Sequence, residues 1–354
     1  MKPDELLREV ARGEPLRGRE LRDVSLVGAD LRGAVFERCA FRRCDLSGVD
    51  WSGAVLRECR IESCRMPRAR LRGVWLVDTL LQDVVLREAD CTRLAASGGG
   101  WLETDLSQAQ CTDMVLNAVR LDRVELAAAR GEKLVLSQCE WAVVDLSRAR
   151  LRRVACIEAD LRRVRWRDSR LQQVVFKGVE FSGLVLEPCV LEHPQFIEAR
   201  LAQSDWSATQ LTAPNFTGAV MEDARLAGLQ LDRAVFLAAQ AERADLSGAS
   251  LVQSIWREAH AGAARFHGAN LYQANLAHAD LSGADLRGCD LTYADLSHAR
   301  LRGTDLRDSR LVRANLHGAE TAQARMGDTR QALGDDPERL AAERWRPPAV
   351  ADES

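Results

Sequence analysis

Residues 269–296 read ANLYQ ANLAH ADLSG ADLRG CDLTY ADL, a motif that recurs every five residues. In each copy a small residue is followed by Asp or Asn and then by leucine, as in Ala284-Asp285-Leu286. A period of five fits neither the 3.6 residues per turn of an α-helix nor the two-residue alternation of a strand. A chain that bends after every five residues instead keeps each leucine on the inside. The period therefore predicts a coil with short sides.

The same phase continues in both directions along the chain. A column of large apolar residues runs in steps of five from Leu21 to Leu316, and all eight phenylalanines fall on it. A column of small residues lies two positions earlier in each repeat. Large aromatic residues also recur at intervals of 20, as in Phe176, Phe196, Phe216, Phe236 and Trp256. Positions 20 apart thus share size, which is the pattern expected if they stack on one another.

In these features the sequence resembles the pentapeptide-repeat family, whose signature is Ala-Asp/Asn-Leu-x-x in tandem. The resemblance covers about residues 19–320. It implies an all-β solenoid, a right-handed four-sided parallel β-helix of about 15 coils with short helical caps. We expect an N-terminal helical cap at 1–18, the repeats at 19–324, and a cap helix with a disordered tail at 325–354.

The two ends of such a coil need covering, because each would otherwise expose apolar side chains and unpaired backbone. Near the N-terminus, residues 3–12 place Leu6, Leu7 and Val10 on one face of a predicted helix. Near the C-terminus, Asp336-Pro337-Glu338 signals a helix to about Arg346 that would present Leu340 and Trp345 to the coil. We expect caps at both ends, and the alternative is a homodimer formed through one of them.

The weakest stretch of the repeat is Ala95-Ala96-Ser97-Gly98-Gly99-Gly100. Three consecutive glycines remove the side chains that a strand would pack, which favours a bulge or protruding loop at 97–100. Local decay of the repeat is one interpretation of this loop. A partner-binding loop is the other.

Charge is unevenly distributed along the chain, although the net charge is only −3. Residues 1–177 contain 32 Lys or Arg and 27 Asp or Glu, whereas residues 178–354 contain 17 and 25. A cluster of arginines in the middle of the chain is the candidate partner-binding surface, together with Leu340 and Trp345; its members are Arg150, Arg152, Arg163, Arg165 and Arg167. Acidic residues interrupt the cluster, so a solvated, salt-bridged surface is the alternative and direct nucleic-acid binding is not expected.

The residues that could carry chemistry are the cysteines, histidines and aspartates. All ten cysteines fall on the two inward columns and are expected to be small buried apolar residues, without disulfides or zinc. His278 and His298 should stack on the outside with Glu258 one turn away, as a solvated ladder. The recurring aspartates are expected to accept hydrogen bonds from the turns. We therefore expect no enzyme, no cofactor and no metal site.

The function that this pattern favours is a non-enzymatic scaffold or adaptor that binds protein partners. Glu5-Leu6-Leu7-Arg8, followed by residues 13–18, is similar to pentapeptide-repeat proteins found with bacterial type VI secretion components, which suggests an accessory role in effector delivery. The alternative, also drawn from the family, is a DNA mimic that binds and protects or inhibits DNA gyrase. The basic first half argues against mimicry. We expect a bacterial cytoplasmic protein without a membrane span.

Overall fold

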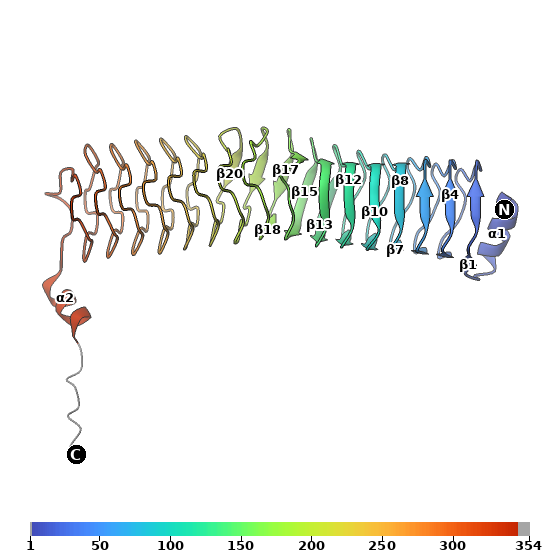
Figure 1. Ribbon diagram of the computed structural model, residues 1–354, viewed down its shortest axis with the longest axis horizontal. Coiled ribbons are helices and arrows are strands. Elements are labelled where there is room, and N and C mark those ends of the chain that lie inside the picture. Colours follow the sequence, from blue (N-terminus) through green and yellow to red (C-terminus); the bar gives the residue numbers. More distant parts are fainter. Residues whose placement is uncertain (1, 346–354) are drawn as a thin grey trace, which may run out of the picture. The chain divides into compact units, whose positions relative to one another are not determined.

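The computed structural model describes residues 2–345 (Figure 1). The chain divides into two compact units, an N-terminal unit at Met1–Arg225 and a C-terminal unit at Leu226–Ser354. Each unit is a parallel β solenoid in which residues pair with those about 20 positions further along the chain. The N-terminal unit makes about 10 such turns. The tail expected at the extreme C-terminus lies outside the described residues.

The named strands belong to the N-terminal unit and form two sheets. The first has 12 strands, which in spatial order are β1 (Leu16–Arg17), β3 (Val35–Glu37), β5 (Val55–Arg57), β7 (Trp75–Val77), β9 (Ala95–Ser97), β11 (Val115–Asn117), β13 (Arg130–Ser137), β15 (Arg150–Ile157), β17 (Arg170–Gln172), β19 (Val190–Glu192) and β20 (Gln210–Thr212), with β18 (Val175–Lys177) also pairing with β15. The second has eight strands, which are β2 (Glu20–Arg22), β4 (Ala40–Arg42), β6 (Arg60–Glu62), β8 (Leu80–Val85), β10 (Gly100–Asp105), β12 (Arg120–Glu125), β14 (Glu140–Asp145) and β16 (Val164–Arg165).

The register of these strands confirms the prediction that residues 20 apart stack. Leu16 pairs with Phe36, and Leu191 pairs with Leu211, in both cases in parallel. The parallel pairing thus begins at Leu16, which itself belongs to the column of large residues that recurs every five positions. Pairing between successive turns satisfies the backbone N–H and C=O groups, because the apolar side chains of the interior offer them no hydrogen-bond partners.

The core is the column of large side chains. Phe196 lies between Phe176 and Phe216, with ring centroids 5.3 and 5.0 Å away, and all three rings are buried. In the C-terminal unit, Phe236 and Trp256 stack in the same way with centroids 3.8 Å apart. Within each unit the aromatic ladder expected from the sequence is confirmed. The ten cysteines are all buried, as expected.

Most of the five-residue repeats end in a turn with one residue in the left-handed region of φ, as at Asp23, Arg38 and Arg43. The aspartates of the repeat hold these turns: the Asp50 carboxylate accepts a hydrogen bond of 3.0 Å from the backbone N–H of Ser52. Corresponding bonds recur in both units and confirm that the aspartates serve the turns.

The protruding loop predicted at 97–100 is wrong. Ser97 pairs with Val77 and Asn117, and Gly100 pairs with Leu80 and Arg120, so no residue is added to the turn. The glycines are needed for a different reason. Gly98 and Gly99 both have positive φ, and a Cβ on Gly99 would lie 2.3 Å from the backbone oxygen of Thr79. Gly98 and Gly99 allow the backbone at this corner to pass close to Asp78 and Thr79 of the preceding turn.

Helix α1 (Pro3–Ala11) confirms the helix predicted near the N-terminus, and its Leu6 is fully buried. In the C-terminal unit the parallel bridges keep the spacing of 20 as far as Asp305 with Arg325. They then change to a spacing of 18, with Arg310 bridging Asp328. None of the described helices is long and apolar enough to cross a membrane.

Helix α2 (Pro337–Arg344) begins where the sequence predicts, because the Asp336 carboxylate accepts hydrogen bonds from the N–H groups of Glu338 and Arg339. The cap contact predicted for it is wrong. No residue of α2 is buried, Leu340 is only half-buried, and Trp345 is 69% exposed. Helix α2 instead contacts the coil through Glu343, whose carboxylate reaches His317.

Candidate functional site

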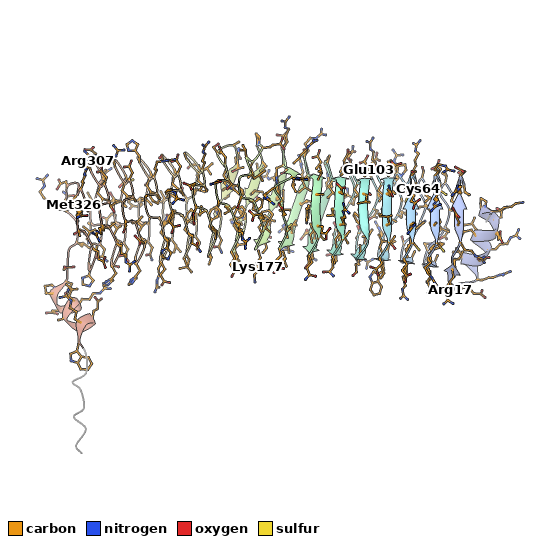
Figure 2. All side chains as sticks on the ribbon, in the orientation of Figure 1. Arg17, Cys64, Glu103, Lys177, Arg307 and Met326 are labelled. Atoms are coloured by element: carbon orange, nitrogen blue, oxygen red, sulfur yellow. The ribbon has the colours of Figure 1, made fainter. Side chains whose placement is uncertain are left out.

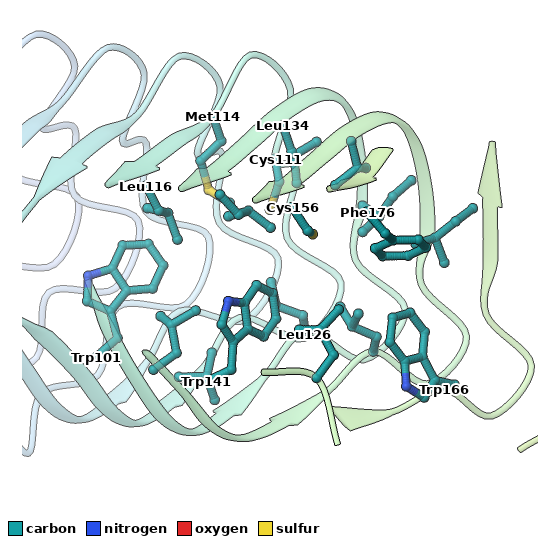
Figure 3. A pocket seen from close by; sticks show the side chains of 18 residues that line it. Trp101, Cys111, Met114, Leu116, Leu126, Leu134, Trp141, Cys156, Trp166 and Phe176 are labelled. Carbon is teal, nitrogen blue, oxygen red and sulfur yellow. The ribbon is translucent and has the colours of Figure 1, made fainter. Parts of the chain in front are cut away.

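The interior of the N-terminal unit is packed with apolar side chains. One cavity of about 20 Å³ lies among Trp101, Trp141 and Trp166 (Figure 3), and a second of the same size lies near Trp51. Each has room for about one water molecule, and the lining of both is apolar. Neither cavity can hold an organic ligand, so a binding site on this unit has to lie on its outer surface. Figure 2 shows the side chains that project from it, Arg17 and Glu103 among them.

A row of apolar side chains projects from the first sheet of the N-terminal unit. Its members stack in register at intervals of 20 residues, and we call them the apolar ladder: Val35, Val55, Trp75, Ala95, Val115, Val135, Ala155 and Val175. Trp75 is 52% exposed, Val115 40% and Val135 38%, and the other five are half-buried. Aligned apolar residues on a surface indicate a contact site, whereas singly scattered ones are ordinary.

Sequence reasoning missed this ladder, although the signal was present. The residue before the large inward one is Asp or Asn in the consensus repeat. In every fourth repeat from Val35 to Val175 it is Val, Trp or Ala instead. Only the 20-residue stacking turns these scattered exceptions into one surface.

The structure distributes the predicted arginine cluster over several strands and turns. Arg150 lies on β15 between Arg130 and Arg170, with which it pairs in register, so three arginines follow one another on adjacent turns. Arg152 lies on the same strand and pairs with Glu132 and Gln172. Arg150 and Arg152 therefore belong to one basic stretch of the sheet.

The other three predicted arginines lie elsewhere. Arg163 is exposed in a turn, and Arg165 on β16 pairs in register with Asp145. The Arg167 guanidinium lies 3.5 Å from the carboxylate of Glu187. The structure thus does not bring all five arginines together.

An open groove of about 380 Å³ lies next to Arg150 and Arg170. Asp168 also lines it, and the Arg170 guanidinium donates to Glu192 at 2.8 Å. The groove is therefore of mixed charge.

Acidic side chains on the outside of both units are held by arginines. The Arg32 side chain and backbone N–H donate to Asp30, which lowers the pKa of that carboxyl to about 2. Hydrogen bonds from the Arg307 side chain lower the pKa of Asp305 to about 2 in the same way. These carboxylates are committed to turns and neighbouring arginines.

The outward histidines of the C-terminal unit form the stack expected from the sequence. His278 and His298 are nearly parallel, with ring centroids 4.9 Å apart. The structure adds two residues that sequence reasoning missed. His317 packs edge-on against His298 at 5.3 Å, and Glu343 of α2 lies within 3.5 Å of both His298 and His317.

A solenoid of parallel turns built from five-residue units defines a repeat protein of the β-solenoid class. The family model described as pentapeptide repeats matches eight copies, at residues that include 20–57, 34–73, 215–253, 239–276, 269–308 and 289–326. The chain belongs to the pentapeptide-repeat family.

Solved structures with similarity to the chain include other pentapeptide-repeat proteins. HetL from the cyanobacterium Nostoc sp. strain PCC 7120, involved in heterocyst differentiation regulation, is 22% identical, with 95% of this chain and 98% of HetL covered and a TM-score of 0.19. QnrB1, a plasmid-mediated fluoroquinolone resistance protein, is 18% identical, with 62% of this chain and 90% of QnrB1 covered and a TM-score of 0.24. A search of curated proteins found no match.

Proposed function

We propose that the protein is a scaffold that binds a protein partner along the apolar ladder of the N-terminal unit. The observation that carries this proposal is the alignment of Trp75 with Val115 and Val135 on one sheet face, each more than a third exposed. A tryptophan in such a row can supply much of the binding free energy of an interface, because it buries a large area with few rotatable bonds.

The backbone beneath the ladder suits this role. Each of these strands is hydrogen-bonded to the turns before and after it, so the ladder side chains have fixed spacing. A partner then orders little of the scaffold on binding, which lowers the entropic cost of association. The basic stretch containing Arg150 and Arg152 begins β15, the strand that also carries Ala155 of the ladder. This basic stretch would favour a protein partner that has acidic residues beside its contact with the ladder.

The test is capture of partners by the tagged full-length protein from its native lysate, with identification by mass spectrometry. The double variant Trp75→Glu with Val115→Glu should lose the partner, because two carboxylates interrupt the apolar row. Val185→Glu is the matched control, since Val185 is 69% exposed in the same unit but lies outside the ladder. Retention of the same partners by the double variant would refute the ladder as the binding surface.

The gyrase alternative receives less support from the C-terminal unit, where acidic residues outnumber basic ones. A DNA mimic needs rows of carboxylates that are free to replace phosphates. Here five of the outward aspartates lie next to arginines, in the pairs Asp245–Arg265, Asp280–Arg300, Asp285–Arg287, Asp290–Arg310 and Asp305–Arg307. Inhibition or protection of gyrase supercoiling at micromolar protein would reverse this preference.

We further infer that the winding is right-handed and four-sided, with one repeat per side and about 15 coils in all, as the family resemblance implies. An accessory role in type VI secretion rests on the similarity at residues 5–18. Recovery of secretion-apparatus or effector proteins in the capture experiment would support it, whereas unrelated partners would count against it.

A further inference from the structure

Helix α2 brings a carboxylate to a pair of imidazoles in the C-terminal unit. The Glu343 carboxylate lies 3.5 Å from Nε2 of His298 and 3.3 Å from Nε2 of His317. One potential ligand atom from each of the three residues lies within 4.8 Å of the other two. The His317 side chain is only 3% exposed, whereas those of His298 and Glu343 are 27% and 34% exposed. The cluster is therefore sheltered on one side and reachable by solvent on the other.

The repeat itself explains why the helix can approach. Stacked corner positions on successive turns carry Glu258, His278, His298 and then Gly318. A Cβ on Gly318 would lie 2.5 Å from Nδ1 of His298. The missing side chain thus leaves room for the His298 ring above the last turn.

We propose that His298, His317 and Glu343 bind a divalent first-row transition metal of the zinc class and thereby fasten α2 to the coil. Two imidazole nitrogens and one carboxylate are a donor set that suits zinc, cobalt and nickel, and hard cations such as Mg²⁺ prefer oxygen ligands alone. Three protein ligands leave a fourth position for water. A metal would replace the contacts of Glu343 with the two rings by three bonds to one ion.

Metal binding at Nε2 of His317 must change which ring nitrogen carries the proton. Nδ1 accepts a hydrogen bond of 3.1 Å from the backbone N–H of Asp336, so the proton of the neutral ring is on Nε2. When the metal takes Nε2, that proton moves to Nδ1. The backbone N–H of Asp336 then loses its acceptor and has to turn away, and the Asp335 carboxylate, 3.9 Å from Nδ1, becomes the acceptor of the new Nδ1–H. A carboxylate behind a ligating histidine fixes the tautomer and strengthens the ligand.

The experiment is titration of the full-length protein with Co²⁺, followed by its visible absorption and by calorimetry. Bound Co²⁺ should give the d–d bands of a site with nitrogen and oxygen ligands and no thiolate charge-transfer band, which separates this site from the cysteines. Glu343→Gln and His317→Gln should each weaken binding about tenfold or more, and Asp335→Asn should weaken it by about 10–100-fold. His278→Ala is the matched control, since its ring stacks on His298 but is not in the donor set.

Fastening of α2 has its own readout in Trp345, which follows the helix directly; its fluorescence is the difference between the protein with Trp345 and its Trp345→Phe counterpart, because the chain has eight tryptophans. Saturating Zn²⁺ should change this fluorescence in the wild type and leave it unchanged in Glu343→Gln. Saturating Mg²⁺ should leave it unchanged in both proteins. Glu343→Gln lies on a helix with no buried residue, so it tests the site without disturbing the coil. Absence of binding at 100-fold excess of metal, or equal affinity in wild type and Glu343→Gln, would overturn the proposal.

Discussion

The ring of Phe196 lies on that of Phe216 with centroids 5.0 Å apart and planes only 5° from parallel. The two residues occupy the same inward position on successive turns, so a change at one removes contacts from both neighbouring turns. Phe196→Ala should lower the free energy of unfolding by about 3–5 kcal/mol. Urea denaturation followed by circular dichroism measures this loss. Phe196→Leu, which restores the commonest residue of the column, should cost less, and a loss below about 1 kcal/mol for the alanine variant would contradict the packing described.

The close approach at Gly99 gives a second prediction. Alanine at this position has to adopt a positive φ and also places its Cβ 2.3 Å from the Thr79 oxygen. Gly53 is the matched control, because it has a similar φ of +71° but a Cβ there would meet no atom within 4 Å. Gly53→Ala should cost about 1 kcal/mol, which reflects the left-handed conformation alone. Gly99→Ala should cost about 1–3 kcal/mol more in the same denaturation assay, and equal losses would show that the corner relaxes freely.

Much of this fold is predictable from the sequence because the interactions that make it are local and repeated. The large column, the small column and the Asp or Asn between them specify the inside, the corner and the turn bond, as Asp50 and Ser52 illustrate. Stacking at 20 residues follows from the spacing of Phe176 and Phe196. The glycines at 98–100 lead to a wrong prediction because glycine favours both loops and close backbone approach, and only the strand register distinguishes the two.

The candidate sites were harder to predict because each depends on residues far apart in sequence. The apolar ladder is assembled from single residues such as Trp75 and Val115, two turns apart. Contact of Glu343 with His317 depends on the path of the non-repeating residues 326–336, after the bridge spacing has changed from 20 to 18. No periodicity describes that path.

Acid sensitivity provides a third prediction. Hydrogen bonds from neighbouring arginines hold the pKa of Asp30, Asp305 and Asp328 at about 2, below the ordinary value of 3.8. A carboxyl with a lower pKa in the folded state stabilises the fold above its unfolded pKa, and this stabilisation is lost as protons are added. Urea midpoints should therefore be level from about pH 7 to pH 5 and fall between about pH 4 and pH 2. Asp305→Asn should flatten that fall, and an unchanged profile in this variant would contradict the assignment.

The buried thiols give a fourth prediction. Burial raises the pKa of Cys111 and of Cys156 to about 12, and burial raises the pKa of Cys91 well above its usual range. Because all ten thiols are buried and out of reach of the reagent, native protein should release almost no thionitrobenzoate from Ellman's reagent at about pH 8. In guanidinium chloride all ten thiols should react. Val115→Cys places a thiol on the exposed ladder and should react within minutes in the native protein. Rapid reaction of the wild type would mean that the turns open on that timescale and that the inward columns are not held closed.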